Sequence, residues 1–443
     1  MKKALATVFA GMIVVGASYL IPRGAVQQTA PEPAPMAVSQ VSVETMSPTP
    51  ASQDRLPEVE RLIDVFETRV AEGNDALDMW TLGGHYLDRA ALTGDVGDYR
   101  LARDVLERAY ETNAGNPNVD LPLAQARLAL HDFAGARRLA EPFAGMTPVD
   151  LNAIALTGDA ALGLGDVESA AEAYQRLLQE GPEDPAVAVR LSSLSFQTGD
   201  RDLAIEQARE ALRLSDQEPA PVRSFYTTYL GLLHFETGQF NEARTILETA
   251  LELDPGSASA MIELGHVLAA QGETEEAIAI LERSMTIGPE PEVAALLGDL
   301  YVLEGETERA EQYYGQVEQI AEKAPEAYRR DVSRFLSDHD RDPERALRLA
   351  EDDLKTRQDS GAYDTLAWAL YRNGRYEEAR TASDQAISVG TSDASAFYHA
   401  GVISLALGER ERGLGEIERA LDINPHFSPL LSLEAADLVA DRA

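Results

Sequence analysis

The sequence predicts an all-α protein, a solenoid of about ten helix–turn–helix repeats that ends in a C-terminal capping helix. The first observation is the stretch 226–255, YTTYLGLLHFETGQFNEARTILETALELDP, where apolar and small residues recur at helical spacing on both sides of one tight turn. The second is repetition, because a turn glycine returns at intervals of 34, 39, 34, 33, 69 and 34 residues. A single unit of this kind leaves an apolar face exposed to water, so it is stable only when other repeats stack against that face.

The turn glycines and the small residues that follow them keep a constant register. Glycine reaches a positive φ without a Cβ clash, which a tight turn between helices requires. Five residues after most of these glycines stands a small residue that lets the paired helices approach closely. The glycines are Gly165, Gly199, Gly238, Gly272, Gly305, Gly374 and Gly408, and the small residues are Ala170, Ala204, Ala243, Ala277, Ala310, Ala379 and Gly413.

This pattern resembles the tetratricopeptide repeat (TPR), a helix–turn–helix unit of 34 residues. In the stretch 226–255, Gly231 and Ala243 take the small positions of that repeat, and Leu230 and Leu247 fill the space beside them. The resemblance covers roughly residues 77–427. It implies a right-handed superhelix in which the first helix of each repeat faces the concave side.

The N-terminal segment indicates the cellular location of the protein. Lys2 and Lys3 precede an apolar run over residues 4–21, which is typical of a signal sequence or an N-terminal membrane anchor. Both alternatives put the rest of the chain on the exported side, because the basic residues stay cytoplasmic. Residues 22–56, rich in Pro, Ala, Ser and Thr, are expected to form a disordered linker.

The folded part divides into three segments. Residues 57–148 are expected to hold N-terminal helices and degenerate repeats, including an overlong turn at 93–98 and a weak unit at 121–143. Residues 149–427 form the regular array, in which the interval of 69 residues spans two units and the first, 327–353, is divergent. Residues 428–443 form the capping helix.

Composition excludes several function classes. Asp and Glu number 75 against 38 Lys and Arg, a net charge of −37, so nucleic acids and anionic membrane surfaces are not expected partners. The acidity fits either a highly solvated surface in a saline environment or a basic partner. The chain has no cysteine, and it lacks the G-x-S-x-G, H-E-x-x-H, P-loop and dinucleotide-binding motifs. We therefore expect no enzymatic activity, no cofactor and no metal site.

One acidic stretch has part of the pattern of a calcium-binding loop. Asp338, Asp340 and Asp342 have the spacing of the first calcium ligands of an EF-hand. However, Pro343 stands where that loop needs glycine, and Leu349 stands where it needs a bidentate glutamate. The stretch is interpreted as the solvated turn of a divergent repeat.

The resemblance also implies which residues project into the concave groove. The set is apolar and aromatic with scattered polar groups, which suits an extended or helical peptide, and stacked aromatic rings would also suit sugar rings. Packing between adjacent repeats is the alternative role for these aromatics. The groove positions are Phe196, Phe225, Thr228, Phe235, His266, Asp299, Tyr328, Phe335, Trp368, Tyr371, Arg372 and Tyr398.

These observations predict a non-enzymatic protein–protein interaction scaffold of the cell envelope that binds a partner segment in its groove. The alternative is a factor for envelope polysaccharide or outer-layer assembly that contacts glycan chains. The protein is expected to be anchored in the inner membrane by its N-terminal segment, or secreted.

Overall fold

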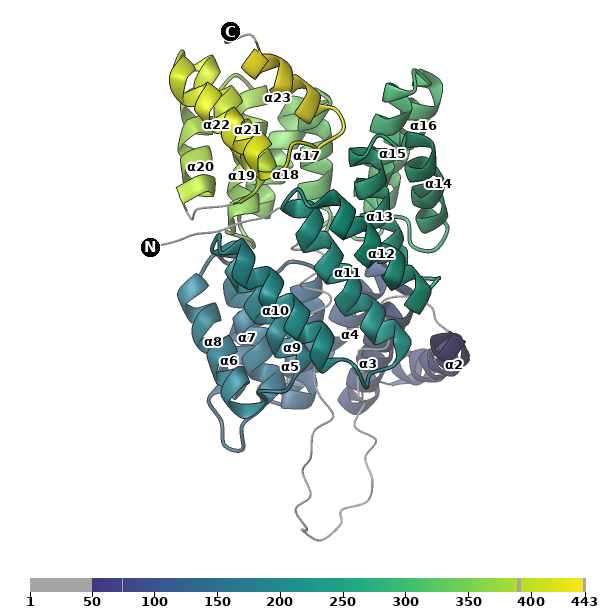
Figure 1. Ribbon diagram of the computed structural model, residues 1–443. Coiled ribbons are helices and arrows are strands. Elements are labelled where there is room, and N and C mark those ends of the chain that lie inside the picture. Colours follow the sequence, from purple (N-terminus) through teal and green to yellow (C-terminus); the bar gives the residue numbers. More distant parts are fainter. Residues whose placement is uncertain (1–49, 74, 389–391, 441–443) are drawn as a thin grey trace.

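The computed structural model describes residues 50–73, 75–388 and 392–440, and within them it contains helices and no strands (Figure 1). An N-terminal helix, α2 (Pro50–Glu72), precedes ten antiparallel helix pairs, and α23 (Leu431–Ala440) follows them. The pairs are α3 (Ala76–Thr93) with α4 (Val96–Asn113), α5 (Pro117–Ala129) with α6 (Phe133–Ala144), α7 (Leu151–Gly163) with α8 (Val167–Glu180), α9 (Pro185–Gln197) with α10 (Arg201–Leu214), α11 (Ala220–Glu236) with α12 (Phe240–Leu253), α13 (Ala258–Ala270) with α14 (Thr274–Met285), α15 (Pro291–Leu303) with α16 (Thr307–Ala321), α17 (Arg329–Asp338) with α18 (Pro343–Asp353), α19 (Ser360–Arg372) with α20 (Tyr376–Ser388), and α21 (Ala394–Ala406) with α22 (Arg410–Ile423). The predicted all-α solenoid of about ten repeats with a capping helix is confirmed.

Close packing inside a repeat follows from its small residues. A Cβ atom added to Gly231 would lie 2.6 Å from Cγ of Leu247, so the glycine lets α11 and α12 come into contact. Leu247 and Ala243 are completely buried. The predicted turn glycines all have a positive φ, between 70° and 80°. The sequence-based assignment of small, large and turn residues is therefore confirmed.

Three local features differ from the expectation. Helix α2 begins at Pro50, inside the stretch 22–56 that was expected to be a linker. The turn expected at 93–98 is short, because α3 and α4 are extended to 18 residues each and only Gly94 and Asp95 lie between them. The degenerate repeats make their turns with non-glycine residues at positive φ, His131 at 62° and Asp340 at 50°.

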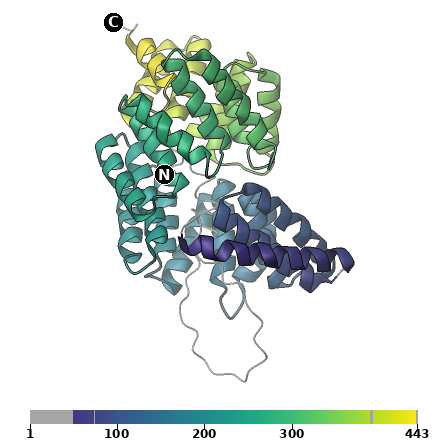
Figure 2. The same ribbon diagram turned by 90° about the vertical axis from the view of Figure 1, so that its right-hand side faces the viewer.

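The solenoid winds far enough for its second part to contact its first part. Figure 2 shows the C-terminal repeats, green to yellow, above the N-terminal repeats, purple to blue. The guanidinium of Arg100 donates a hydrogen bond of 2.8 Å to the carbonyl of Lys323, 223 residues away. The amide of Gln358 donates to the carbonyl of Gly163 at 3.1 Å. These contacts join successive turns of the superhelix, so the array is a closed coil rather than an open arc.

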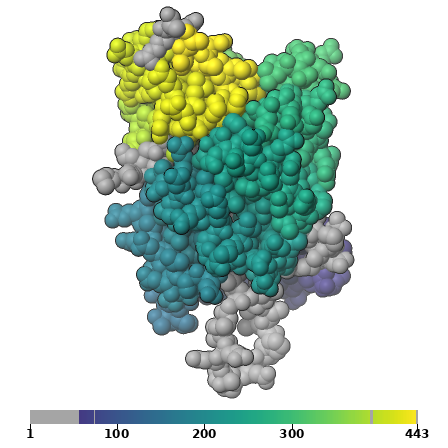
Figure 3. All heavy atoms as spheres, in the orientation of Figure 1, coloured from purple at the N-terminus to yellow at the C-terminus, as the bar shows by residue number. Residues whose placement is uncertain are grey.

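The C-terminal segment completes this closure. The side-chain amide of Asn424, which is 1% exposed, donates to the carbonyl of Phe235 at the end of α11. The rings of His426 and Phe240 lie 5.4 Å apart. The yellow C-terminal atoms accordingly abut the teal surface of α11 and α12 (Figure 3). Helix α23 then buries Leu431 and Ala435 in a cluster with Tyr398 and Val402.

In the part of the chain that the structure describes, no helix is both long and apolar enough to cross a lipid bilayer. The predicted signal sequence or anchor at 1–21 and most of the predicted linker lie outside the described residues.

Candidate functional site

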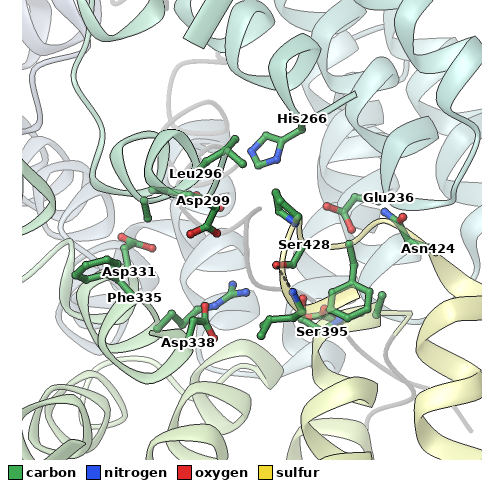
Figure 4. A pocket seen from close by; sticks show the side chains of 18 of the residues that line it. Glu236, His266, Leu296, Asp299, Asp331, Phe335, Asp338, Ser395, Asn424 and Ser428 are labelled. Carbon is green, nitrogen blue, oxygen red and sulfur yellow. Dashed lines mark hydrogen bonds between the residues drawn. The ribbon is translucent and has the colours of Figure 1, made fainter. Parts of the chain in front are cut away.

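The first helices of the middle repeats surround a cavity of about 130 Å³, called here the acidic cavity. Figure 4 shows its labelled side chains converging from several helices and from the segment that follows α22. Its lining residues are Phe235, Glu236, Glu263, His266, Glu292, Ala295, Leu296, Asp299, Asp331, Arg334, Phe335, Asp338, His339, Asp393, Ala394, Ser395, Asn424, Phe427, Ser428, Pro429 and Leu431. The cavity therefore lies on the concave side, and the closing segment 424–431 forms one of its walls.

Three glutamates give this cavity its electrostatic character. Burial, reinforced by Asp393 and Glu292, raises the pKa of Glu236 from 4.5 to about 8. Burial also raises the pKa of Glu292 to about 7 and the pKa of Glu263 well above its ordinary value. At neutral pH Glu236 and Glu292 accordingly hold protons for part or most of the time.

Three of the four aspartates that line the cavity form hydrogen bonds to protein groups instead. Asp299 accepts hydrogen bonds from the hydroxyl of Tyr314 at 2.7 Å and from Nε2 of His339 at 2.6 Å. Burial is the largest single influence on His339 and disfavours its charged form, but the hydrogen bond to Asp299 and the negative charges of Asp299 and Asp338 together outweigh it and raise the pKa of the imidazole. Asp338 accepts from the indole of Trp368 at 2.8 Å, and Asp393 caps α21 by accepting from the amide of Ser395.

Arg334 is the one arginine in the cavity lining. Burial opposes its charge, but the carboxylates of Asp338, Asp393 and Asp364 more than compensate and raise the pKa of the guanidinium. It therefore stays a cation at all physiological pH values. The carboxyl groups that line the cavity outnumber this single guanidinium.

A second, larger cavity of about 220 Å³ adjoins the first and is called here the apolar cavity. It lies between the α3–α5 region and helices α13, α15 and α17, so it exists only because the two turns of the superhelix meet. Ile262, Ile287 and Val293 are among its apolar lining residues. The two cavities share Glu263, His266, Glu292 and Asp331.

The predicted groove residues fall into two groups. Phe235, His266, Asp299 and Phe335 line the acidic cavity, and Tyr328 lines the apolar cavity. Burial lowers the pKa of His266 to about 4, so this ring is neutral. The structure thus brings five of the twelve predicted residues together. Whether they contact a partner stays a prediction.

The other predicted groove residues line neither cavity. Trp368 is 1% exposed, with the ring of Tyr371 stacked on it at 4.8 Å and the ring of His399 at 4.3 Å. These aromatics pack between adjacent repeats, which was the alternative role foreseen for them. Tyr371 and Arg372 are half-buried, and the buried members of this group are Phe196, Phe225, Thr228, Trp368 and Tyr398.

Sequence reasoning missed the glutamates of the acidic cavity and its closing segment. A signal for Glu263 was present, because it stands two residues before the small Gly265 of its first helix. The equivalent positions in neighbouring repeats hold Tyr229 and Leu296, both buried. A charged residue at an apolar repeat position indicates a specialised site. Nothing in the sequence of the closing segment 424–431 indicated that it would form a wall of the cavity.

No group of three or more His, Cys, Asp or Glu side chains suited to a metal ion occurs within the described ranges. Two of the three aspartates with calcium-loop spacing have other partners: Asp338 accepts a hydrogen bond from Trp368, and Asp342 accepts one from the amide of Arg345 as the cap of α18.

Comparison with known proteins agrees with this architecture. Family models described as tetratricopeptide repeat match residues 121–185, 155–219, 234–300, 291–323 and 365–426, together more than half of the chain. A curated relative, the CTR9 homolog of Arabidopsis thaliana, is 27% identical over 108 residues, which are 24% of this chain and only 10% of that protein.

Two solved structures are among those to which the chain is similar. Yeast Tom70 has a TM-score of 0.41 and 15% identity, with 88% of this chain and 96% of that chain covered. The human IFIT1 dimer with PPP-AAAA has a TM-score of 0.44 and 16% identity, with 83% and 94% covered. The matching family models and the ten helix pairs together show that the chain belongs to the tetratricopeptide repeat family.

Proposed function

We propose that this protein is a non-enzymatic scaffold of the cell envelope that binds a segment of a partner protein on the concave side of its repeats. Tetratricopeptide arrays are protein-interaction scaffolds, and their concave surfaces are built by the first helices of successive repeats. The observation that carries the proposal is the acidic cavity, to which four consecutive first helices, α11, α13, α15 and α17, all contribute side chains.

The envelope location is proposed from the basic and apolar N-terminal segment, Lys2 and Lys3 followed by residues 4–21. It is tested by protease treatment of intact spheroplasts. Digestion of the repeats from outside supports export, and full protection until lysis contradicts it.

The structure favours a protein partner over a glycan. The glycan alternative depended on exposed aromatic faces, yet Trp368 is covered on its faces by Tyr371 and His399. The guanidinium of Arg372 also lies 4.5 Å from the Trp368 ring. A sugar ring has no free face of this tryptophan to stack on.

Site-specific photo-cross-linking in native cells tests the proposal. A photo-reactive amino acid is placed at Ala295, which lines the acidic cavity, and in a matched protein at Glu276, which is exposed on α14. We expect one partner segment to be captured from position 295 and not from position 276. Capture from position 276 alone, or equally from both, would place recognition on the convex face and refute the proposal.

A further inference from the structure

We infer that the acidic cavity binds a positively charged side chain, an arginine or lysine of the partner segment, and that Glu263 is its central carboxylate. This inference rests on the proposed function, because it specifies the chemistry of the segment that the concave side would receive. It is carried by the charge balance of the cavity and by one buried acceptor that the protein leaves unpaired.

Carboxyl groups outnumber cations among the residues that line the acidic cavity. Seven carboxyl groups face one arginine, Arg334, and one histidine with a raised pKa, His339, while His266 is neutral. Both of these basic groups interact chiefly with aspartates: Arg334 with Asp338 and Asp393, and His339 with Asp299. The seven carboxyl groups are Glu236, Glu263, Glu292, Asp299, Asp331, Asp338 and Asp393.

Glu263 is the acid that the protein leaves unsatisfied. It is 3% exposed, and its Oε2 atom has no hydrogen-bond partner among the described residues. The charged groups that act on it are both acidic, Glu236 from α11 and Glu292 from α15. A buried acceptor without a donor is unfavourable, so a ligand that supplies N–H donors and positive charge gains this interaction on binding.

The apolar cavity defines the rest of the ligand. Glu263 and Glu292 line both cavities. A peptide whose basic side chain binds between these two glutamates therefore places its neighbouring residues against Ile262 and Val293. The charged groups of the apolar cavity are Arg330 and the acids Glu263, Glu290, Glu292 and Asp331. The segment that fits both cavities therefore carries a basic residue next to an aliphatic one.

Cation binding at this place is coupled to proton release. Burial raises the pKa of Glu236 to about 8 and of Glu292 to about 7, so both carboxyls hold protons for part of the time at neutral pH. A bound guanidinium favours the ionised carboxylates, and their protons pass to the buffer. A ligand held by apolar contacts alone releases none.

The test is calorimetric titration of the full chain, in detergent, with the peptide acetyl-Leu-Arg-Leu-amide. Its matched probe carries citrulline, which keeps the shape of arginine and removes the charge. We expect the arginine peptide to bind about tenfold more tightly or better. Buffers of different ionisation enthalpy are expected to show proton release at pH 7.

Variants complete the test. Glu263→Gln keeps the side-chain volume and is expected to abolish the preference for arginine over citrulline, whereas Glu276→Gln, on the exposed face of α14, is expected to preserve it. If Glu263→Gln fails to fold, Glu292→Gln makes the same comparison. Equal affinity for both peptides, a preference that survives in Glu263→Gln, or no binding to the unmodified chain would overturn the inference.

The experiments distinguish a failure of the proposed function from a failure of the cation site. A cross-link from Ala295 to a partner segment without basic residues would keep the scaffold and remove the cation site. Arginine-selective binding without any cross-linked protein would keep the cation site and remove the protein partner.

Discussion

Replacing Gly231 with alanine tests the helix contact on which every repeat depends. The added Cβ would lie 2.6 Å from Cγ and 2.8 Å from Cδ2 of Leu247, whose side chain is completely buried. Overpacking of this kind costs about 1–3 kcal/mol, and the better helix propensity of alanine offsets about 1 kcal/mol. We expect a net destabilisation of about 1 kcal/mol.

Substituting Leu247, the residue that the added methyl group would meet, measures the coupling between the two positions. Leu247→Ala alone removes a buried side chain and should cost about 2–5 kcal/mol. In the double variant the clash disappears and the new methyl group lies against the vacated space, so Gly231→Ala becomes stabilising by about 1 kcal/mol. The cycle therefore predicts a coupling energy of about 1–3 kcal/mol between the two positions.

Native-state hydrogen exchange of amides in α11 and α12 measures the free energy of opening for this repeat. The control is Gly315→Ala in α16, where an added Cβ meets nothing within 4 Å and should stabilise by about 1 kcal/mol. Additivity of the two substitutions within about 0.5 kcal/mol would refute the argument from close contact.

Three further outcomes follow from buried polar groups. Asp159→Ala removes the carboxylate that accepts hydrogen bonds from Nε and Nη2 of the buried Arg190 at 2.9 and 3.0 Å, and we expect a loss of about 3–5 kcal/mol in the free energy of unfolding by denaturant; a loss below about 1 kcal/mol would contradict this. Asn424→Ala removes the bond to the carbonyl of Phe235 and should speed proteolysis within 424–431 severalfold, while unchanged cleavage would show that this contact does not close the coil. Because burial raises the folded-state pKa values of Glu236, Glu263 and Glu292 above the unfolded value of 4.5, the stability they confer is complete below about pH 4.5 and is lost up to about pH 8. The melting temperature should fall over that window, and less so in Glu263→Gln; equal slopes in both proteins would exclude this cause.

Interactions within one repeat were predictable from the sequence because they act over short, periodic separations. Gly231 and Leu247 belong to one helix pair, and the positive φ of Gly238 follows from the turn that joins its helices. The prediction of an overlong turn at 93–98 was wrong, because the extra residues lengthen the two flanking helices and not the loop between them.

Contacts between superhelical turns were beyond sequence reasoning. No periodic signal relates Phe235 to Asn424, which lie 189 residues apart, because the superhelical pitch sums small rotations over many repeats. Periodicity also cannot separate an aromatic ring that faces the groove from one that packs between repeats, as Trp368 does. Glu263 was recognisable in principle, since it replaces an apolar side chain in its repeat.

The most direct measurement of the central claim is hydrogen exchange of the full chain with and without the partner segment captured from Ala295. Recognition inside the coil predicts slower exchange in the first helices α11, α13, α15 and α17 and in the closing segment 424–431, with α12, α14 and α16 unchanged. Protection confined to α12, α14 and α16 would contradict the account and place the partner on the outer surface.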